Sequence, residues 1–253
     1  MRFIARRRRS AKTTAWGAIS LFVMLGVWQL QAQDVKTQYL RMAPIEQYLM
    51  DRNAEVALAR SAAPEAISRD ATVLVLGRHG YEMAVQGKSG FVCMVERGWV
   101  GPSDWPDFWN PKIRGADCLN PPAARSILPI ARMRTEMVLA GRPTTEIVEG
   151  IRTALGKGEV PRLEPGAMSY MMSKGSYLTD EDDHNAPHLM FYMPLSDAAA
   201  WGADLPGSPV GSAPYWFFSE KTSQDLNGFP PLRVFAVEVS KWSDGTVAPV
   251  HQE

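Results

Sequence analysis

This chain has few cysteines, none of the common catalytic motifs and no excess of charge of either sign. Only two cysteines occur in 253 residues, which excludes a disulfide-rich scaffold. Lysine plus arginine and aspartate plus glutamate each number 27, for a formal net charge of +0, so the balance gives no support to nucleic-acid binding. There is no G-x-S-x-G elbow, phosphate-binding loop, dinucleotide fingerprint, H-E-x-x-H or C-x-x-C motif. The enzyme classes that carry those motifs therefore lose support.

The composition that remains is that of an ordinary globular protein. Hydrophobic residues make up 45% and charged residues 21% of the chain, which excludes a disordered chain, a collagen and a multi-span membrane protein. The sequence has neither an internal repeat nor a charge-rich linker. The simplest partition is a secretory signal peptide over residues 1–32 and one mature domain over 33–253.

The signal peptide is predicted from the first 32 residues. Six basic residues lie within the first twelve positions, no acid precedes Asp34, and an apolar run covers about residues 15–30 before Ala32. This is the layout of a cleaved leader, and the run is shorter than the ~20 residues that span a bilayer comfortably. The alternative is an uncleaved single-helix anchor. We therefore expect a bacterial protein that is periplasmic or secreted, with no stable membrane insertion after cleavage.

Removal of the leader changes the charge of the protein. The mature chain keeps 21 basic residues against 27 acids, a formal charge of −6. Such a chain repels phosphate backbones and anionic lipid, so no nucleic-acid partner is expected.

Both cysteines, Cys93 and Cys118, lie in the mature chain. An even pair in an oxidising compartment predicts one disulfide; two buried free thiols are the alternative.

The hydrophobic pattern predicts an α+β fold, with a mainly antiparallel sheet of about five or six short strands and three main helices. The helices are expected at about residues 44–61, from Asn120 to about residue 140 with Asn120 as the cap, and after Pro143 to an end at Gly156 or Gly158. The segments with strand-like patterns are 72–76, 81–86, 91–97, 167–173, 188–193, 215–219 and 232–239.

A hairpin of 81–86 with 91–97, turning at Lys88-Ser89, places Tyr81 opposite Glu96 with His79 on the same face. Histidine beside a carboxylate is a common acid/base pair, so His79 and Glu96, together with His188, are candidate catalytic residues. The alternative is a pair of solvated side chains at the end of a hairpin.

His188 follows an acidic stretch that contains Asp183 and His184. Carboxylate and imidazole side chains hold divalent cations, so Asp183, His184 and His188 are candidate metal ligands and a divalent metal is the candidate cofactor. A solvated acidic loop is the alternative. His188 stands at the boundary between that loop and an apolar strand, where we expect it to be partly buried with a carboxylate or His79 within reach.

The segment from Trp99 to Pro122 is expected to be long and irregular, and it is rich in aromatic side chains. Trp105 and Trp109, with Tyr81, are candidate binding residues for a flat small-molecule ligand. The alternative is a small local core.

Four stretches carry a resemblance to other proteins: Val-Leu-Gly-Arg-His-Gly-Tyr-Glu at 75–82, Phe-Trp-Asn-Pro-Lys-Ile-Arg at 108–114, Pro-Gly-Ala-Met-Ser-Tyr-Met-Met-Ser at 165–173 and Pro-His-Leu-Met-Phe-Tyr at 187–192. In these the chain resembles a group of exported bacterial proteins of uncharacterised function. The resemblance implies a bacterial envelope or secreted setting and carries no catalytic residue. We therefore expect a small-molecule-binding or envelope-associated module. The alternative is a small hydrolase-like or metal-dependent periplasmic enzyme using His79, Glu96 or His188.

The signal peptide makes a direct prediction about the mature N-terminus. Cleavage after Ala32 leaves Gln33 as the first residue, because a small residue precedes the cut in such leaders. N-terminal sequencing of protein recovered from the periplasm or medium should begin at or near Gln33. Intact Met1 on membrane-bound material would show an anchor instead.

Overall fold

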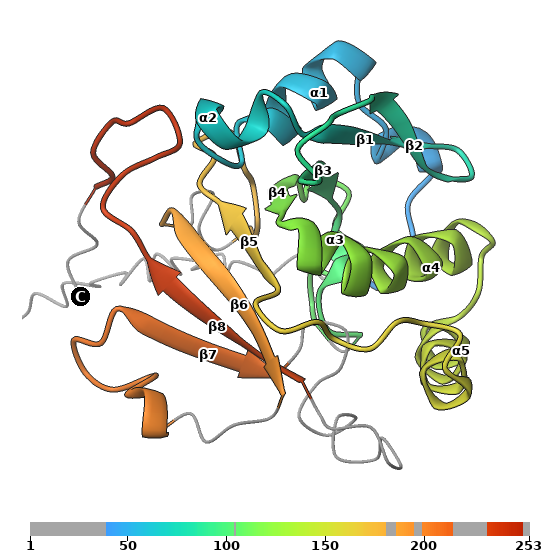
Figure 1. Ribbon diagram of the computed structural model, residues 1–253. Helices are drawn as coiled ribbons and strands as arrows, with labels where there is room; N and C mark the ends of the chain where they lie inside the picture. The colour runs from blue at the N-terminus through green and yellow to red at the C-terminus, as the bar shows by residue number, and fades with distance from the viewer. Residues whose placement is uncertain (1–38, 104, 181–185, 195–198, 215–231, 250–253) are drawn as a thin grey trace, which may run out of the picture. The chain divides into compact units, whose positions relative to one another are not determined.

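The computed structural model describes residues 39–249, apart from Asp104 and the segments 181–185, 195–198 and 215–231. These residues form one eight-stranded sheet in the order β2-β1-β3-β4-β5-β6-β8-β7, together with five α-helices (Figure 1). The strands are β1 (Thr72–Gly77), β2 (Gly80–Val85), β3 (Val92–Glu96), β4 (Gly115–Leu119), β5 (Met168–Met171), β6 (His188–Pro194), β7 (Val210–Pro214) and β8 (Leu232–Glu238).

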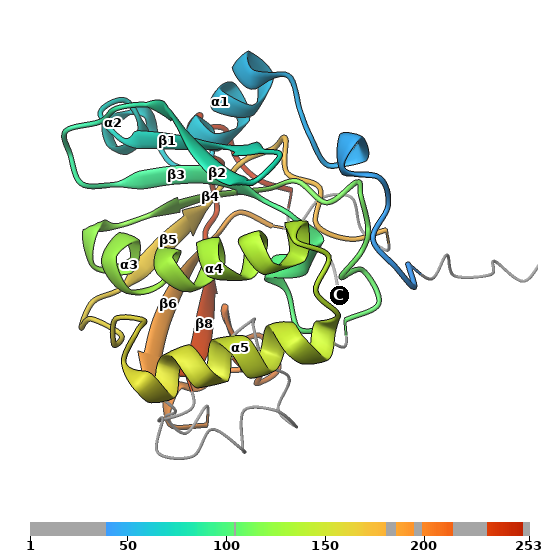
Figure 2. The same cartoon turned by 90° about the vertical axis from the view of Figure 1, so that its right-hand side faces the viewer.

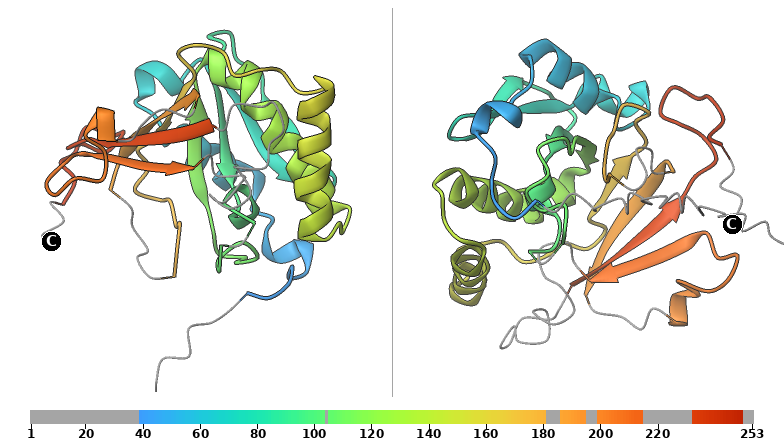
Figure 3. Two further views of the ribbon diagram at one scale, coloured as in Figure 1. Left: turned by 90° about the horizontal axis from the view of Figure 1, so that it is seen from below. Right: turned by 180° about the vertical axis from the view of Figure 1, so that it is seen from behind.

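Helices cover both faces of the first half of the sheet. The helix α1 (Arg52–Arg60) packs on β1, β3 and β4, and the four-residue α2 (Glu65–Ser68) follows it. On the other face lie α3 (Pro121–Ser126), α4 (Leu128–Leu139) and α5 (Thr144–Lys157) (Figure 2). The strands β6, β8 and β7 continue the sheet beyond β5 (Figure 3). The sheet therefore has a core on each side. We call the side that faces α1 the α1 face, and the side that faces α4 the α4 face.

The expected helices begin and end where local signals place them. The carboxylate of Asp51 accepts hydrogen bonds from two backbone N–H groups, so α1 begins there and not at Pro44, where a short 3-10 turn (Ile45–Gln47) stands instead. Asn120 caps α3 as expected, and Pro129 separates α3 from α4. Gly158, at φ 71°, ends α5. In the described part of the chain, none of the helices combines the length and apolar character needed to cross a membrane.

The expected strand count of five or six is wrong, because the sheet has eight strands and includes one parallel pair. Two strands account for the difference. The strand β4 was assigned to the irregular aromatic segment, since Gly, Asp and Cys at 115, 117 and 118 have no strand signature. The strand β7 lies in a stretch rich in Gly, Pro and Ser, which carries no strand-like pattern in the sequence. The expected strand at 215–219 lies outside the described residues.

The expected hairpin between 81–86 and 91–97 is also wrong. The strand β2 pairs with β1 through a tight turn between Gly77 and Gly80, and Tyr81 lies opposite Leu76. A positive φ of 142° at Gly80 suits this turn to glycine. The strand β3 instead runs parallel to β1 and antiparallel to β4. The periodicity was correct, but alternation alone does not choose a strand's partner.

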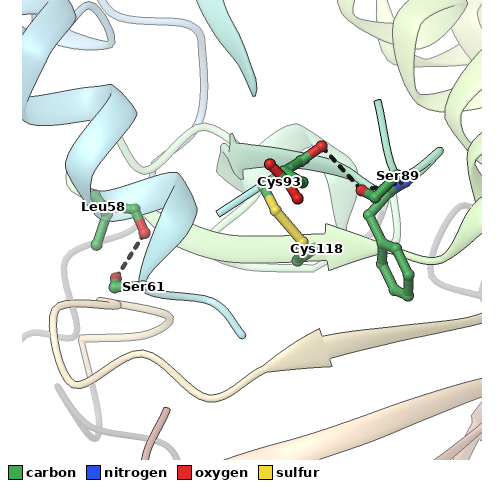
Figure 4. The surroundings of a disulfide bond; sticks show 7 residues. Leu58, Ser61, Ser89, Cys93 and Cys118 are labelled. Atoms are coloured by element: carbon green, nitrogen blue, oxygen red, sulfur yellow. Dashed lines mark hydrogen bonds between the residues drawn. A yellow bond between two sulfur atoms is a disulfide. The ribbon is translucent and has the colours of Figure 1, made fainter. Parts of the chain in front are cut away.

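The predicted Cys93–Cys118 disulfide is confirmed. The two residues lie directly opposite each other on β3 and β4, with their Cα atoms 3.9 Å apart. Figure 4 shows the bond between the two strands. Both side chains are fully buried on the α1 face, in a cluster with small residues such as Ala59 and Ala116. The bond therefore closes the base of the aromatic segment between β3 and β4. Within that segment Trp99 and Phe108 are buried in the α4-face core.

A buried ion pair joins α1 to the end of β3. The Arg97 Nη2 atom lies 2.8 Å from Glu55 Oε1, and the two side chains are 0% and 1% exposed. The same Glu55 oxygen accepts a hydrogen bond from the backbone N–H of Leu76. Arg97 also donates to the carbonyl oxygens of Tyr48 and Val95. Both charged groups of this buried pair therefore have partners, which come from four segments of the chain.

Replacing Glu55 tests the contribution of this pair. In Glu55→Gln the Arg97 charge stays buried without its counter-ion, so the free energy of unfolding should fall by ~3–5 kcal/mol. The control, Glu46→Gln, breaks the exposed Arg78–Glu46 pair and should leave the free energy of unfolding nearly unchanged. Urea unfolding measures both, and equal losses in the two variants would contradict a special role for Glu55.

Candidate active site: a buried carboxyl pair

Two carboxyl side chains meet on the α4 face of the sheet. Glu96 ends β3 opposite Gly115, while Asp117 lies opposite Met94 on the adjacent β4. Because side chains alternate between faces, Glu96 and Asp117 point to the same side and are diagonal neighbours, within reach of each other. Asp117 is 0% exposed, and Glu96 keeps part of its surface open to solvent.

The buried Asp117 carboxyl has no ordinary hydrogen-bond donor. Among the described residues, no donor meets hydrogen-bond geometry at either of its oxygens. The Ser169 hydroxyl and the Cys118 N–H lower its pKa, but they do so without forming such a bond. A buried carboxylate whose donors fall short of ordinary geometry is costly, and a proton shared with the nearby Glu96 carboxyl offsets that cost.

Both pKa values respond to this arrangement. Burial, followed by the charge and hydrogen bond of Asp117, raises the pKa of Glu96 well above its ordinary value, and the positive charge of Arg134 opposes that rise. Burial raises the pKa of Asp117 as well, while the hydrogen bond from Glu96 lowers it. These opposite signs indicate that Glu96 is the member that holds the proton and donates it to Asp117.

Arg134 of α4 lies close enough to the pair for its positive charge to lower the pKa of Glu96. It is fully buried, donates to the carbonyl oxygen of Gly101 at 2.8 Å, and lies over the Phe108 ring at 5.1 Å. Its charge therefore moderates the acidity of Glu96 from a fixed position.

His188 is buried on the same face but does not join the carboxyl pair. It is 7% exposed, its Nδ1 lies 2.8 Å from the Ala186 oxygen, and burial lowers its pKa. Met171 on β5 separates it from β4, and its other cross-strand neighbour is Glu238. A carboxylate thus lies beside His188, as expected, though it is not Glu96.

The remaining sequence candidates are dispersed. His79 is exposed in the β1–β2 turn, so it does not share a cross-strand site with Glu96. Tyr81 is buried on the α4 face, where its hydroxyl donates to the Val95 oxygen and burial raises its pKa. Trp105 packs over Gly101, and Trp109 contacts Phe108 edge-on. Trp105 and Trp109 are both partly buried, and Trp109 packs against the α4-face core.

The metal hypothesis concerns residues that are largely outside the description. Asp183 and His184 lie outside the described residues, and only His188 of the three can be placed. Elsewhere in the described chain, no three His, Cys, Asp or Glu side chains gather as a metal site would require.

Asp117 and Arg134 were missed by sequence analysis. Asp117 stands in Ala-Asp-Cys-Leu, a run too short and mixed to be recognised as a buried strand, and so its carboxyl gave no sign of being buried. The available signal was a single acid between otherwise apolar or small residues.

A separate open hollow of about 890 Å³ lies at the start of the described chain. It is lined by the consecutive residues from Tyr39 to Ile45 and by Leu139 of α4.

Searches of protein-family models, curated proteins and solved structures gave no match to this chain.

The carboxyl pair predicts an unusual pH dependence of stability. Burial raises the pKa of Asp117 to about 7, and that of Glu96 also rises, so the folded state binds protons more tightly than the unfolded chain. The stabilising contribution is present below the unfolded pKa values of about 4 and is lost as pH rises toward about 7. In Asp117→Asn this loss should shrink by a few kcal/mol, at ~1.4 kcal/mol per pKa unit.

Urea unfolding at intervals across that pH range measures the effect. The control, Asp204→Asn, removes an exposed carboxyl whose pKa is lowered by Ser212, and it should leave the trend in this range unchanged. Parallel curves for the wild type and Asp117→Asn would rule out a shared proton.

Proposed function

We propose that this chain is an exported acid–base enzyme of the hydrolase type, with Glu96 as its catalytic acid. The observation that carries the proposal is the buried Asp117 carboxyl, whose oxygens lack a donor of ordinary geometry among the described residues. A carboxyl held protonated near neutral pH is a competent general acid. Glu96 has both the raised pKa and the partial exposure that this role requires.

The two carboxyls have different roles in this proposal. Protonated Glu96 donates its proton to the leaving oxygen or nitrogen as the scissile bond breaks. The carboxylate thus formed then accepts a proton from the water that adds its hydroxyl to the other fragment, which restores the acid. Asp117 is a positioning residue: its burial keeps it from the substrate, and its negative charge raises the proton affinity of Glu96.

The charges around the pair favour an uncharged substrate. Arg97 is neutralised by Glu55, and Arg134 contacts backbone carbonyls and the Phe108 ring. Arg97 is thus already paired within the protein, while the negative charge of the carboxyl pair repels anions. An ester, an amide or a glycoside without an acidic group fits this balance.

Export is part of the proposal. It is supported by the basic and apolar first 32 residues and by the Cys93–Cys118 disulfide, a bond that persists in oxidising compartments. Both features suit a periplasmic or secreted bacterial protein.

A ligand-binding module is the second candidate, and the hollow along Tyr39–Ile45 favours it. Its volume of about 890 Å³ lies within the usual range of small-molecule sites, ~300–1,000 Å³. A Leu139→Trp substitution that abolished a ligand-induced thermal shift, with Glu96→Gln silent, would favour this module over the enzyme.

The enzyme proposal is tested by turnover of neutral nitrophenyl esters, anilides and glycosides between about pH 4 and about pH 8. Glu96→Gln should reduce turnover by roughly 10²–10⁴-fold, the usual contribution of a general acid. Asp117→Asn should move the alkaline limb of the pH–rate profile to lower pH, since it removes the charge that holds the proton on Glu96.

The matched control is Glu82→Gln, which alters an exposed glutamate on β2 and should leave turnover unchanged. Equal activity in Glu96→Gln and Glu82→Gln would refute the role of Glu96, as would turnover of none of the three substrate classes.

A further inference from the structure

The segment Tyr177–Asp180, which we call the cover segment, follows β5 and lies against the start of β4. Its first residue exchanges two backbone hydrogen bonds with Arg114, at 2.8 and 3.0 Å, in an isolated antiparallel bridge. Arg114 directly precedes β4. The bridge therefore brings the cover segment to the end of the sheet where Glu96 lies.

Leu178 of the cover segment occupies the space beside Glu96. Gly115, the cross-strand partner of Glu96, has no side chain, and a Cβ atom built there would lie 3.0 Å from Leu178 Cδ2 and 3.7 Å from Glu96 Cβ. Leu178 is partly buried against the α4-face core. An apolar side chain thus stands next to the partly exposed member of the carboxyl pair.

The far end of the cover segment is fastened by Asp180. Its carboxylate accepts hydrogen bonds from the Tyr39 hydroxyl at 2.6 Å, from Lys112 Nζ at 2.7 Å and from Asn110 Nδ2 at 3.1 Å. The Tyr177 hydroxyl donates to the same carboxylate. These donors come from the start of the described chain, the aromatic segment and the cover segment itself.

This fastening differs in kind from the buried Glu55–Arg97 pair. The side chains of Lys112 and Asp180 are 55% and 27% exposed, and ion pairs open to solvent contribute little stability. The core of the sheet does not depend on Asp180. The Thr179 hydroxyl also donates to Asp107 at 3.1 Å. Loss of the Asp180 contacts should therefore loosen the cover segment while the core of the sheet stays intact, as in segments that gate sites.

We propose that the cover segment is a lid over Glu96, latched by Asp180, and that its release admits substrate to the carboxyl pair. This inference rests on the proposed function for its purpose, because it describes access to the same site. Its physical content, the shielding of Glu96, can be measured without any substrate.

The test is chemical labelling of carboxyl groups in the full-length mature protein with a water-soluble carbodiimide and glycinamide. Peptide mass spectrometry then gives the labelling rate of Glu96. Asp180→Asn weakens the latch and should raise that rate by about tenfold, since labelling follows the population of the open form. Tyr39→Phe removes one of the donors and should raise it by a smaller factor. Circular dichroism melts of each variant record whether the global fold is kept.

The matched control is Asp244→Asn. Asp244 is also an exposed carboxylate, bound to Lys174 and Thr246, but it lies outside the cover segment, so Glu96 labelling should stay at the wild-type rate. Equal labelling in Asp180→Asn, Tyr39→Phe and the wild type would overturn the lid. Faster labelling in a protein without hydrolase activity would sustain the lid and refute the enzyme. Activity together with unchanged labelling would do the reverse.

Discussion

The pairing of Glu55 with Arg97 is the constraint on which the rest of the molecule depends. Arg97 follows Glu96 directly, so the three anchors of its guanidinium fix the backbone at the end of β3. One anchor reaches Tyr48, whose hydroxyl in turn donates to the Trp109 oxygen at 2.7 Å. The chain before α1, the sheet and the aromatic segment are thereby held to one buried cation, and the carboxyl pair inherits its position from that network.

The core holds buried carboxyl groups in two chemically different ways. Glu55 keeps a full counter-ion and a backbone N–H. Neither oxygen of Asp117 has a hydrogen bond of ordinary geometry among the described residues, and its neighbour is a second carboxyl. The first arrangement is satisfied at any pH at which both groups are charged, whereas the second requires a proton. Because a proton exchanges with solvent, the second arrangement makes the stability of the core depend on pH.

Local features were predictable from the sequence, and pairings were not. The Asn120 cap and the Cys93–Cys118 bond were found because each depends on chemistry carried by the residues themselves. Glu96 was singled out as a candidate, but with partners taken from a hairpin that does not form. Its true neighbour, Asp117, stands in a strand of low strand propensity that is stabilised by burial on both faces. Which strand lies beside which is decided by packing over the whole sheet, and a pattern of alternation carries no information about it.

The disulfide and the carboxyl pair occupy opposite faces of the same two strands. Because Cys93 and Cys118 are directly opposed, their bond admits one register only between β3 and β4, and that register directs Asp117 away from the alanines of the α1 face. A single-residue insertion within β4 would turn the acid toward those alanines and part the two sulfurs. In the aromatic segment before β4, no alternation of side chains between two faces of a sheet has to be kept. Over evolutionary time, changes of length in this region should therefore accumulate ahead of Gly115 and be absent between Gly115 and Cys118.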